Sequence, residues 1–163
     1  MRVAAVLCAA IVLWTILRFL PDSFIVSLFC RIPAELAALF YNAELQKPEL
    51  LFEARGVVFH VARSCAATDF FVMCSTIDIL VCRRFRRTGM SIVLFAYLFT
   101  LLVNTIRLIF LVPATAFMYN HLPVKTHAAF HQFAGTIIFL TAFIILWEFS
   151  RHVARKHAKR QSV

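Results

Sequence analysis

Four long apolar runs constrain this chain more than any other feature of its sequence. The first covers residues 3–20, and the others cover about 65–82, 90–118 and 128–149. A helix needs roughly 20 apolar residues to cross a bilayer, and each run approaches or exceeds that length. Apolar residues make up 62% of the chain, against roughly 45–50% in soluble domains. The sequence therefore predicts an all-α polytopic membrane protein.

The net charge of +9 is concentrated in two basic clusters that directly follow apolar runs. Basic residues beside transmembrane segments are typical of cytoplasmic loops, and they also attract anionic lipids. We therefore assign the charge to membrane topology, with the lipid bilayer as a partner, and expect no nucleic-acid partner. The clusters consist of Arg83, Arg84, Arg86 and Arg87, and of Arg151, Arg155, Lys156, Lys159 and Arg160 in the tail from about residue 151.

Residues 24–41 have a mixed character that favours an amphipathic helix in the membrane interface. Apolar side chains recur at helical spacing, while Arg31 and Glu35 fall on the other side. A helix that spans the bilayer and packs against its neighbours is the alternative, so the side on which the N-terminus lies stays open. The apolar face consists of Ile25, Leu28, Phe29, Ile32, Leu36, Leu39 and Phe40.

A polar stretch follows and leads to the first cysteine of interest. Residues 51–55 and 57–61 flank Gly56, which predicts a short hairpin on the outer side of the membrane. Together with the apolar runs, this predicts a compact bundle of four to five transmembrane helices. We expect residues 1–163 to form a single membrane domain.

Three polar residues reach one depth when the helices are measured outward from the basic clusters. At 1.5 Å per residue, Cys65 and Arg107 lie about 27 and 28 Å from the first cluster, and His131 lies about 30 Å from the second. The hydrocarbon core is itself about 30 Å thick. The three residues therefore meet at the outer boundary of the membrane.

Cys65 is the candidate nucleophile. We expect it to begin a helix, where the helix dipole favours a thiolate. Arg63 and Arg107 would act in the same direction, whereas Asp69 would oppose them. The five cysteines include no CxxC pair and no zinc spacing. The alternative for Cys65 is a buried, inert packing residue.

Arg107 lies in the apolar segment LLVNTIRLIFLV, where a charged side chain is unfavourable. A charge at the centre of a transmembrane helix costs at least about 2.5–3.5 kcal/mol. Near a helix end it can extend to the interface as a simple anchor. Asn104 lies one turn earlier on the same helical face. The pair indicates a site that binds an oxyanion or a carboxylate.

His127 and His131 share one helical face in HAAFHQFAG. Two histidines at this spacing bind zinc in HExxH motifs, but Ala128 replaces the glutamate here and no third ligand is evident. We therefore expect no metal and no cofactor. His131 is the better proton acceptor for a thiol. Gly135, one turn later, would allow close helix contact around His131.

The segments SCAATDFF, LLVNTIRLI and HQFAGTIIF occur in the order typical of the exosortase/archaeosortase family. The resemblance covers the chain from about residue 21 to 150. The chain most resembles the family's short exosortase K branch. The resemblance implies a multi-pass cysteine peptidase or transpeptidase of the bacterial inner membrane, with its active site facing the periplasm. Its substrates would be membrane-anchored proteins with a C-terminal sorting signal of the PEP-CTERM type: a short motif, a transmembrane helix and a basic tail. In that pattern Cys65 is the nucleophile, His131 the general acid/base and Arg107 the electrostatic stabiliser.

Two positions depart from the family pattern. Members commonly have Gly where this chain has Ala67, and often Asn where it has Asp69, and these differences bear on rate and substrate choice. Two other functions stay open from the residues alone. One is a non-enzymatic membrane assembly or transport subunit, and the other is a membrane thiol oxidoreductase that pairs Cys65 with Cys30.

Overall fold

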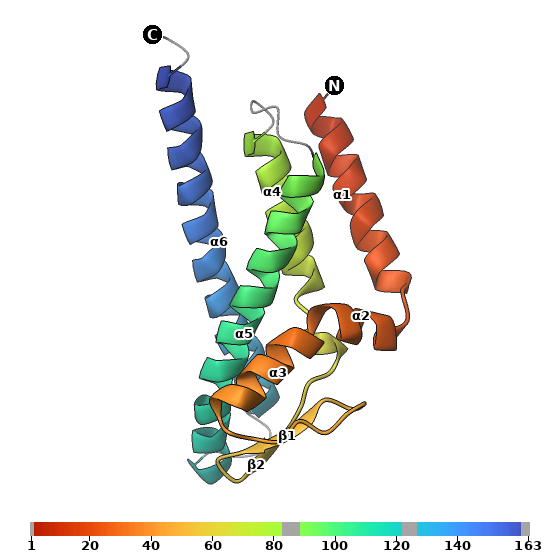
Figure 1. The fold of residues 1–163 in the computed structure, drawn as a ribbon, viewed down its shortest axis with the longest axis vertical. Helices are drawn as coiled ribbons and strands as arrows, with labels where there is room; N and C mark the ends of the chain where they lie inside the picture. The colour runs from red at the N-terminus through yellow and green to blue at the C-terminus, as the bar shows by residue number, and fades with distance from the viewer. Residues whose placement is uncertain (1, 83–88, 122–126, 161–163) are drawn as a thin grey trace. The chain divides into compact units, whose positions relative to one another are not determined.

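The computed structural model describes residues 2–82, 89–121 and 127–160. It confirms an all-α membrane protein with one short β-hairpin (Figure 1). The elements are α1 (Arg2–Phe19), α2 (Asp22–Phe29), α3 (Arg31–Phe40), β1 (Leu51–Ala54), β2 (Val57–His60), the 3₁₀ turn η1 (Arg63–Cys65), α4 (Thr68–Cys82), α5 (Gly89–His121) and α6 (His127–Arg160).

Two of the described helices are long and apolar enough to cross a membrane. They are α5, over Ser91–Tyr119, and α6, over Ala129–His152. A third span results if α1 and α2, which are separated by a short break in the helix, are counted together. Helix α4 has 15 residues, which gives a length of about 22 Å. The expected total of four to five spans stays a prediction, and the basic cluster at residues 83–87 lies outside the described residues.

Contacts within the chain group it into two compact units. The first unit contains α1, α4, the part of α5 up to Thr100 and the part of α6 from Leu140 onward. Helix α1 packs against α4 (Figure 1), and Trp14 Nε1 donates to Asp69 Oδ1 at 2.7 Å. Hydrogen bonds of this kind join helices in a bilayer, where hydrophobic forces between helices are weak.

The second unit contains α2, α3, the hairpin, η1, the part of α5 from Leu101 and the part of α6 up to Phe139. The predicted hairpin is confirmed, because β1 and β2 pair antiparallel. Arg55 and Gly56 form its two-residue turn, both with positive φ (55° and 73°). This geometry suits the right-handed twist of the strands and explains the glycine.

The single helix expected over residues 24–41 is wrong, because the chain forms α2 and α3 with a break at Cys30. Pro33 explains the break. In a continuous helix its ring would clash with the carbonyl four residues earlier, whereas the first turn of a new helix accommodates it. The break therefore comes just before the position where a proline is tolerated.

The large apolar residues that the sequence placed on one face of α3 are exposed, which is compatible with the expected helix in the membrane interface. The small residues of α3 are buried, while bulky apolar side chains such as Leu39 and Phe40 are 72% and 62% exposed. In a bilayer, small residues allow close helix packing, and lipid chains accommodate the large ones. The buried face consists of Pro33, Ala34, Ala37 and Ala38.

Candidate functional site

The residues expected to form the site lie on three segments of the second unit. Cys65 ends η1, Asn104 and Arg107 belong to α5, and His131 and Gly135 belong to α6. His127 is the first residue of α6, but its side chain is outside the described part of the structure.

Cys65 is buried, with 5% of its surface exposed, and lies in the 3₁₀ turn three residues before α4 begins. The expectation that it begins a helix is therefore wrong. Ala67 separates the turn from α4 with φ at +53°, a left-handed conformation that only glycine adopts without steric cost. Cys65 therefore does not belong to the first turn of α4, and the backbone at position 67 explains why glycine suits it.

Two side chains tie the Cys65 turn to α2. Arg63 donates to the carbonyl of Leu20 at 2.8 Å and forms an ion pair with Asp22. The Cys30 thiol donates to the carbonyl of Ala62 at 3.7 Å. Arg63 therefore fixes the turn to the start of α2, a structural role that differs from the thiolate support expected of it.

Asn104 joins three segments through its buried amide. Its Nδ2 donates to the carbonyl of Cys65 at 2.8 Å and to that of Phe29 at 3.3 Å. In a continuous helix the N–H of residue 33 would donate to the Phe29 carbonyl, but Pro33 has no N–H. Asn104 donates to this carbonyl instead and thereby links α5 to both the α2–α3 break and the Cys65 turn.

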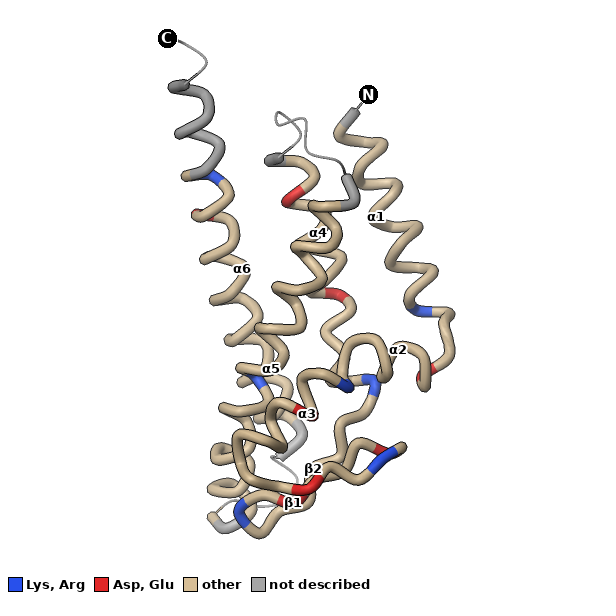
Figure 2. Tube along the Cα trace, viewed as in Figure 1, with Lys and Arg blue, Asp and Glu red and all other residues tan. Residues whose placement is uncertain are grey.

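Arg107 is 5% exposed. The sequence of α5 contains no other Lys, Arg, Asp or Glu, so the described part of this helix is almost entirely tan in Figure 2. Nε and Nη1 of Arg107 have no hydrogen-bond partner in the part of the chain that the structure describes. The guanidinium lies over the ring of Phe139, 5.0 Å from the centroid. A buried cation with N–H groups left free is costly unless an anionic group binds it. The geometry thus provides a binding position for a carboxylate or an oxyanion.

Gly135 makes room for Arg107. A Cβ atom at Gly135 would lie 2.7 Å from Arg107 Nε and 3.1 Å from Nη2. The sequence suggested that Gly135 allows close helix contact around His131. In the structure, the atoms closest to an added Cβ at Gly135 belong instead to Arg107 of α5. His131 itself is half-buried, and the charge of Arg107 acts on both His131 and Cys65.

Cys30 lies near the site residues. The sequence suggested it only as a disulfide partner of Cys65. Burial raises the pKa of its thiol to about 12, Cys65 acts in the same direction, and Arg107 offsets part of the rise. Cys30 and Cys65 are both free cysteines. Cys30 therefore stays protonated at neutral pH. Within the described ranges, no three His, Cys, Asp or Glu side chains are grouped as metal ligands.

Comparison with known proteins gives one match. A family model described as transmembrane exosortase matches residues 48–148, a range that contains every candidate site residue. Neither the comparison with curated proteins nor that with solved structures gives a match.

Proposed function

This chain belongs to the transmembrane exosortase family, and on that premise we propose that it is a membrane-embedded cysteine peptidase or transpeptidase. Its substrates are membrane-anchored exported proteins with a C-terminal sorting signal of the PEP-CTERM type. The enzyme works in a bacterial inner membrane, with its site on the periplasmic side. The resemblance to the exosortase K branch favours a short form of the enzyme.

One observation carries the proposal. Two buried nitrogens of Arg107, Nε and Nη1, have no hydrogen-bond partner among the described residues, and they lie in the same unit as a buried cysteine and a half-buried histidine. Donors placed where negative charge develops stabilise the tetrahedral intermediate of acyl transfer, and they act more strongly in a site that excludes water. A guanidinium is suited to this because it presents several donors in a fixed planar fork.

The reaction then proceeds in two stages. His131 takes the thiol proton of Cys65, and the sulfur attacks the peptide carbonyl just outside the membrane. Arg107 donates hydrogen bonds to the oxyanion. The C–N bond breaks as His131 returns the proton to the leaving amine, which leaves a thioester on Cys65. Water or an acceptor amine then attacks the thioester and frees the thiol.

Asn104 acts as a positioning residue in this scheme. Its hydrogen bond to the Cys65 carbonyl holds the backbone of the nucleophile, and its bond to Phe29 holds the α2–α3 break. It binds the main chain of the turn and needs no contact with substrate.

The test is whether a membrane protein with such a C-terminal signal stays uncut in cells that carry Cys65→Ala. The uncut form should accumulate with Cys65→Ala, and also with Arg107→Lys, because a point charge does not reproduce the guanidinium fork. Cys8→Ala is the matched control, since Cys8 is an exposed cysteine of α1. Normal processing with Cys65→Ala, at equal protein levels, would refute the proposal.

A further inference from the structure

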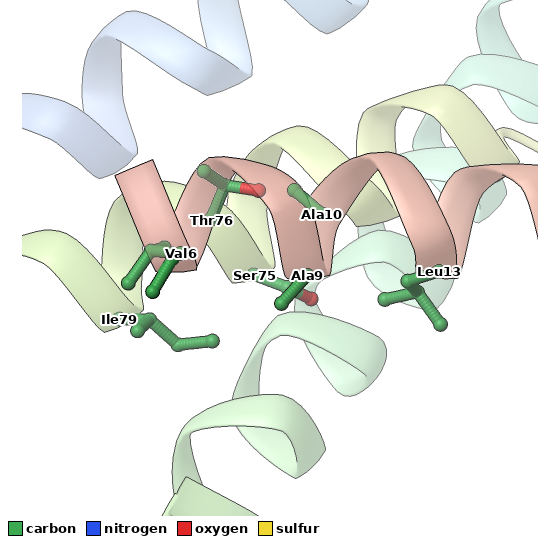
Figure 3. A pocket seen from close by; sticks show the side chains of 8 residues that line it. Val6, Ala9, Ala10, Leu13, Ser75, Thr76 and Ile79 are labelled. Carbon is green, nitrogen blue, oxygen red and sulfur yellow. The ribbon is translucent and has the colours of Figure 1, made fainter. Parts of the chain in front are cut away.

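A cavity of about 260 Å³ lies between α1 and α4 in the first unit (Figure 3). Its lining residues belong to the first unit, whereas the residues proposed for catalysis belong to the second. Small side chains form much of its wall. The lining residues are Ala5, Val6, Ala9, Ala10, Leu13, Ser75, Thr76 and Ile79.

The α1 wall has the pattern of a helix-packing surface. Ala5 and Ala9 are four residues apart and thus lie on one face of α1. Small residues at this spacing let the backbone of another transmembrane helix approach closely. The space remains open beside α1 even though α1 already packs against α4.

Ser75 is an independent sign that this cavity takes a polar partner. Its side chain lines the cavity and is only 2% exposed, yet its Oγ has no hydrogen-bond partner among the described residues. A hydroxyl on a transmembrane helix ordinarily donates to the carbonyl four residues earlier. That bond is made by Thr15, Thr76, Thr100, Thr105 and Thr136.

The depth of Ser75 distinguishes between two occupants, a lipid chain and a helix. Ser75 is the central residue of α4, with seven residues of the helix on either side. On the prediction that α4 crosses the membrane, Ser75 lies near the middle of the bilayer. A phospholipid presents only hydrocarbon there, because its ester and phosphate groups lie at the edges of the bilayer. A transmembrane helix presents backbone carbonyls and small polar side chains at every depth.

A neighbouring groove of about 460 Å³ provides a contrast. It shares Ala10 and Thr76 with the cavity, but large apolar side chains such as Leu7, Met73 and Phe143 form most of its wall. Its polar lining atoms have partners: Thr76 donates within α4, and Trp14 donates to Asp69. That groove suits lipid chains.

We propose that the cavity lined by Ala5, Ala9 and Ser75 binds the transmembrane helix of the protein substrate. A small residue of that helix faces Ala9, and a carbonyl or hydroxyl oxygen accepts from Ser75. The inference rests on the proposed function, which supplies a substrate with one membrane helix. Along the chain, α4 begins three residues after Cys65, so the helix that would hold the substrate directly follows the nucleophile.

The experiment measures substrate capture by an enzyme that cannot cleave. The substrate is first identified as the membrane protein that accumulates uncut in Cys65→Ala cells. Its co-purification with the Cys65→Ala protein is then compared among second-site variants. Ala9→Leu fills the cavity, and Ala4→Leu is its control on an exposed α1 position outside the lining. Ser75→Ala removes the hydroxyl that has no partner among the described residues. Thr100→Val is its control, because Thr100 is a buried residue outside the lining whose hydroxyl donates within α5.

We expect Ala9→Leu to lower capture about tenfold and Ser75→Ala about threefold, whereas both controls match the parent. Ala9→Leu and Ser75→Ala should slow substrate processing when they are made in the enzyme that retains Cys65, while the alkylation rate of Cys65 stays unchanged. Equal capture by Ala9→Leu and Ala4→Leu would overturn the proposal and leave the proposed function standing. A phospholipid displaced by Ala9→Leu, with capture unchanged, would make the cavity a lipid site. If no protein accumulates in Cys65→Ala cells, the proposed function fails, and the substrate-helix proposal fails with it.

Discussion

Gly135 of α6 leaves the space in which the guanidinium of Arg107 lies, because a Cβ atom there would be 2.7 Å from Nε. The guanidinium fits beside α6 because residue 135 has no side chain. Its Nε and Nη1 are buried and have no hydrogen-bond partner in the described structure. Changes at Gly135 should act on catalysis through Arg107.

Gly135→Ala should lower activity by about 10- to 100-fold, since a misplacement near 1 Å of a positioned group costs that much. The protein should remain folded, because alanine favours a helix over glycine by about 1 kcal/mol and the arginine side chain can shift. Substrate processing and thermal unfolding in detergent measure the two effects. In an Arg107→Ala background the change should cost little more. A full additional loss there would show that Gly135 acts on something other than Arg107.

Asn104→Ala should destabilise the protein by about 1–3 kcal/mol, because it leaves two buried carbonyls without their donor. Asn104→Asp should be at least as harmful, since an ionised carboxylate accepts but does not donate. Thr105→Val is the matched control, because Thr105 is a buried neighbour whose hydroxyl donates to the carbonyl of Leu101 in its own helix. Thermal unfolding gives the comparison. Equal stability of the Asn104 and Thr105 variants would contradict the role assigned to Asn104.

Ala67→Gly should stabilise the turn after Cys65. Alanine in the left-handed region costs about 1–2 kcal/mol, which exceeds the roughly 0.4–1 kcal/mol that glycine loses through the freedom of the unfolded chain. Ala66→Gly is the control, because Ala66 has φ at −73° and is fully buried. We expect the melting temperature to rise with the first change and fall with the second. A fall with both would mean that position 67 is not strained.

Cys30 should resist alkylation at neutral pH. With a pKa of about 12, only about one thiol in ten thousand is ionised at pH 8, and the thiolate is the reactive form. The alkylation rate of Cys30 should continue to rise with pH above 8, because its raised pKa moves formation of the reactive thiolate to higher pH. In a Cys65→Ala protein, mass spectrometry should find Cys8 modified well before Cys30. Equal rates at the two cysteines at pH 8 would contradict this.

The sequence was sufficient for the features that follow from local chemistry. The long apolar runs gave α1, α5 and α6, and the glycine between alternating residues gave the hairpin turn. Arg107 and Asn104 were recognisable because polar side chains are rare within an apolar run. Their spacing placed them on one face of α5, and the structure has both buried in the second unit.

Other features depend on contacts between segments that are distant in sequence. Pro33 lies near the middle of an apparently continuous amphipathic pattern. Its lack of an N–H leaves the Phe29 carbonyl without a helical donor, and the structure shows that the distant Asn104 donates to that carbonyl. The guanidinium beside Gly135 comes from another helix, so the sequence assigned the glycine to His131, its neighbour on α6. On α3 the periodicity identified the large apolar residues, but it did not show that the small residues Ala34, Ala37 and Ala38 form the buried face.

The central claim is that Cys65 is a nucleophile activated by Arg107 and His131. The most direct test is the pH dependence of Cys65 alkylation by a membrane-impermeant reagent in intact cells, with the other four cysteines replaced. The parent is compared with Arg107→Ala and His131→Ala at equal membrane levels. We predict fast labelling at neutral pH in the parent and slower labelling in each variant. Labelling that is absent, or that follows the same pH curve in all three proteins, would contradict the account.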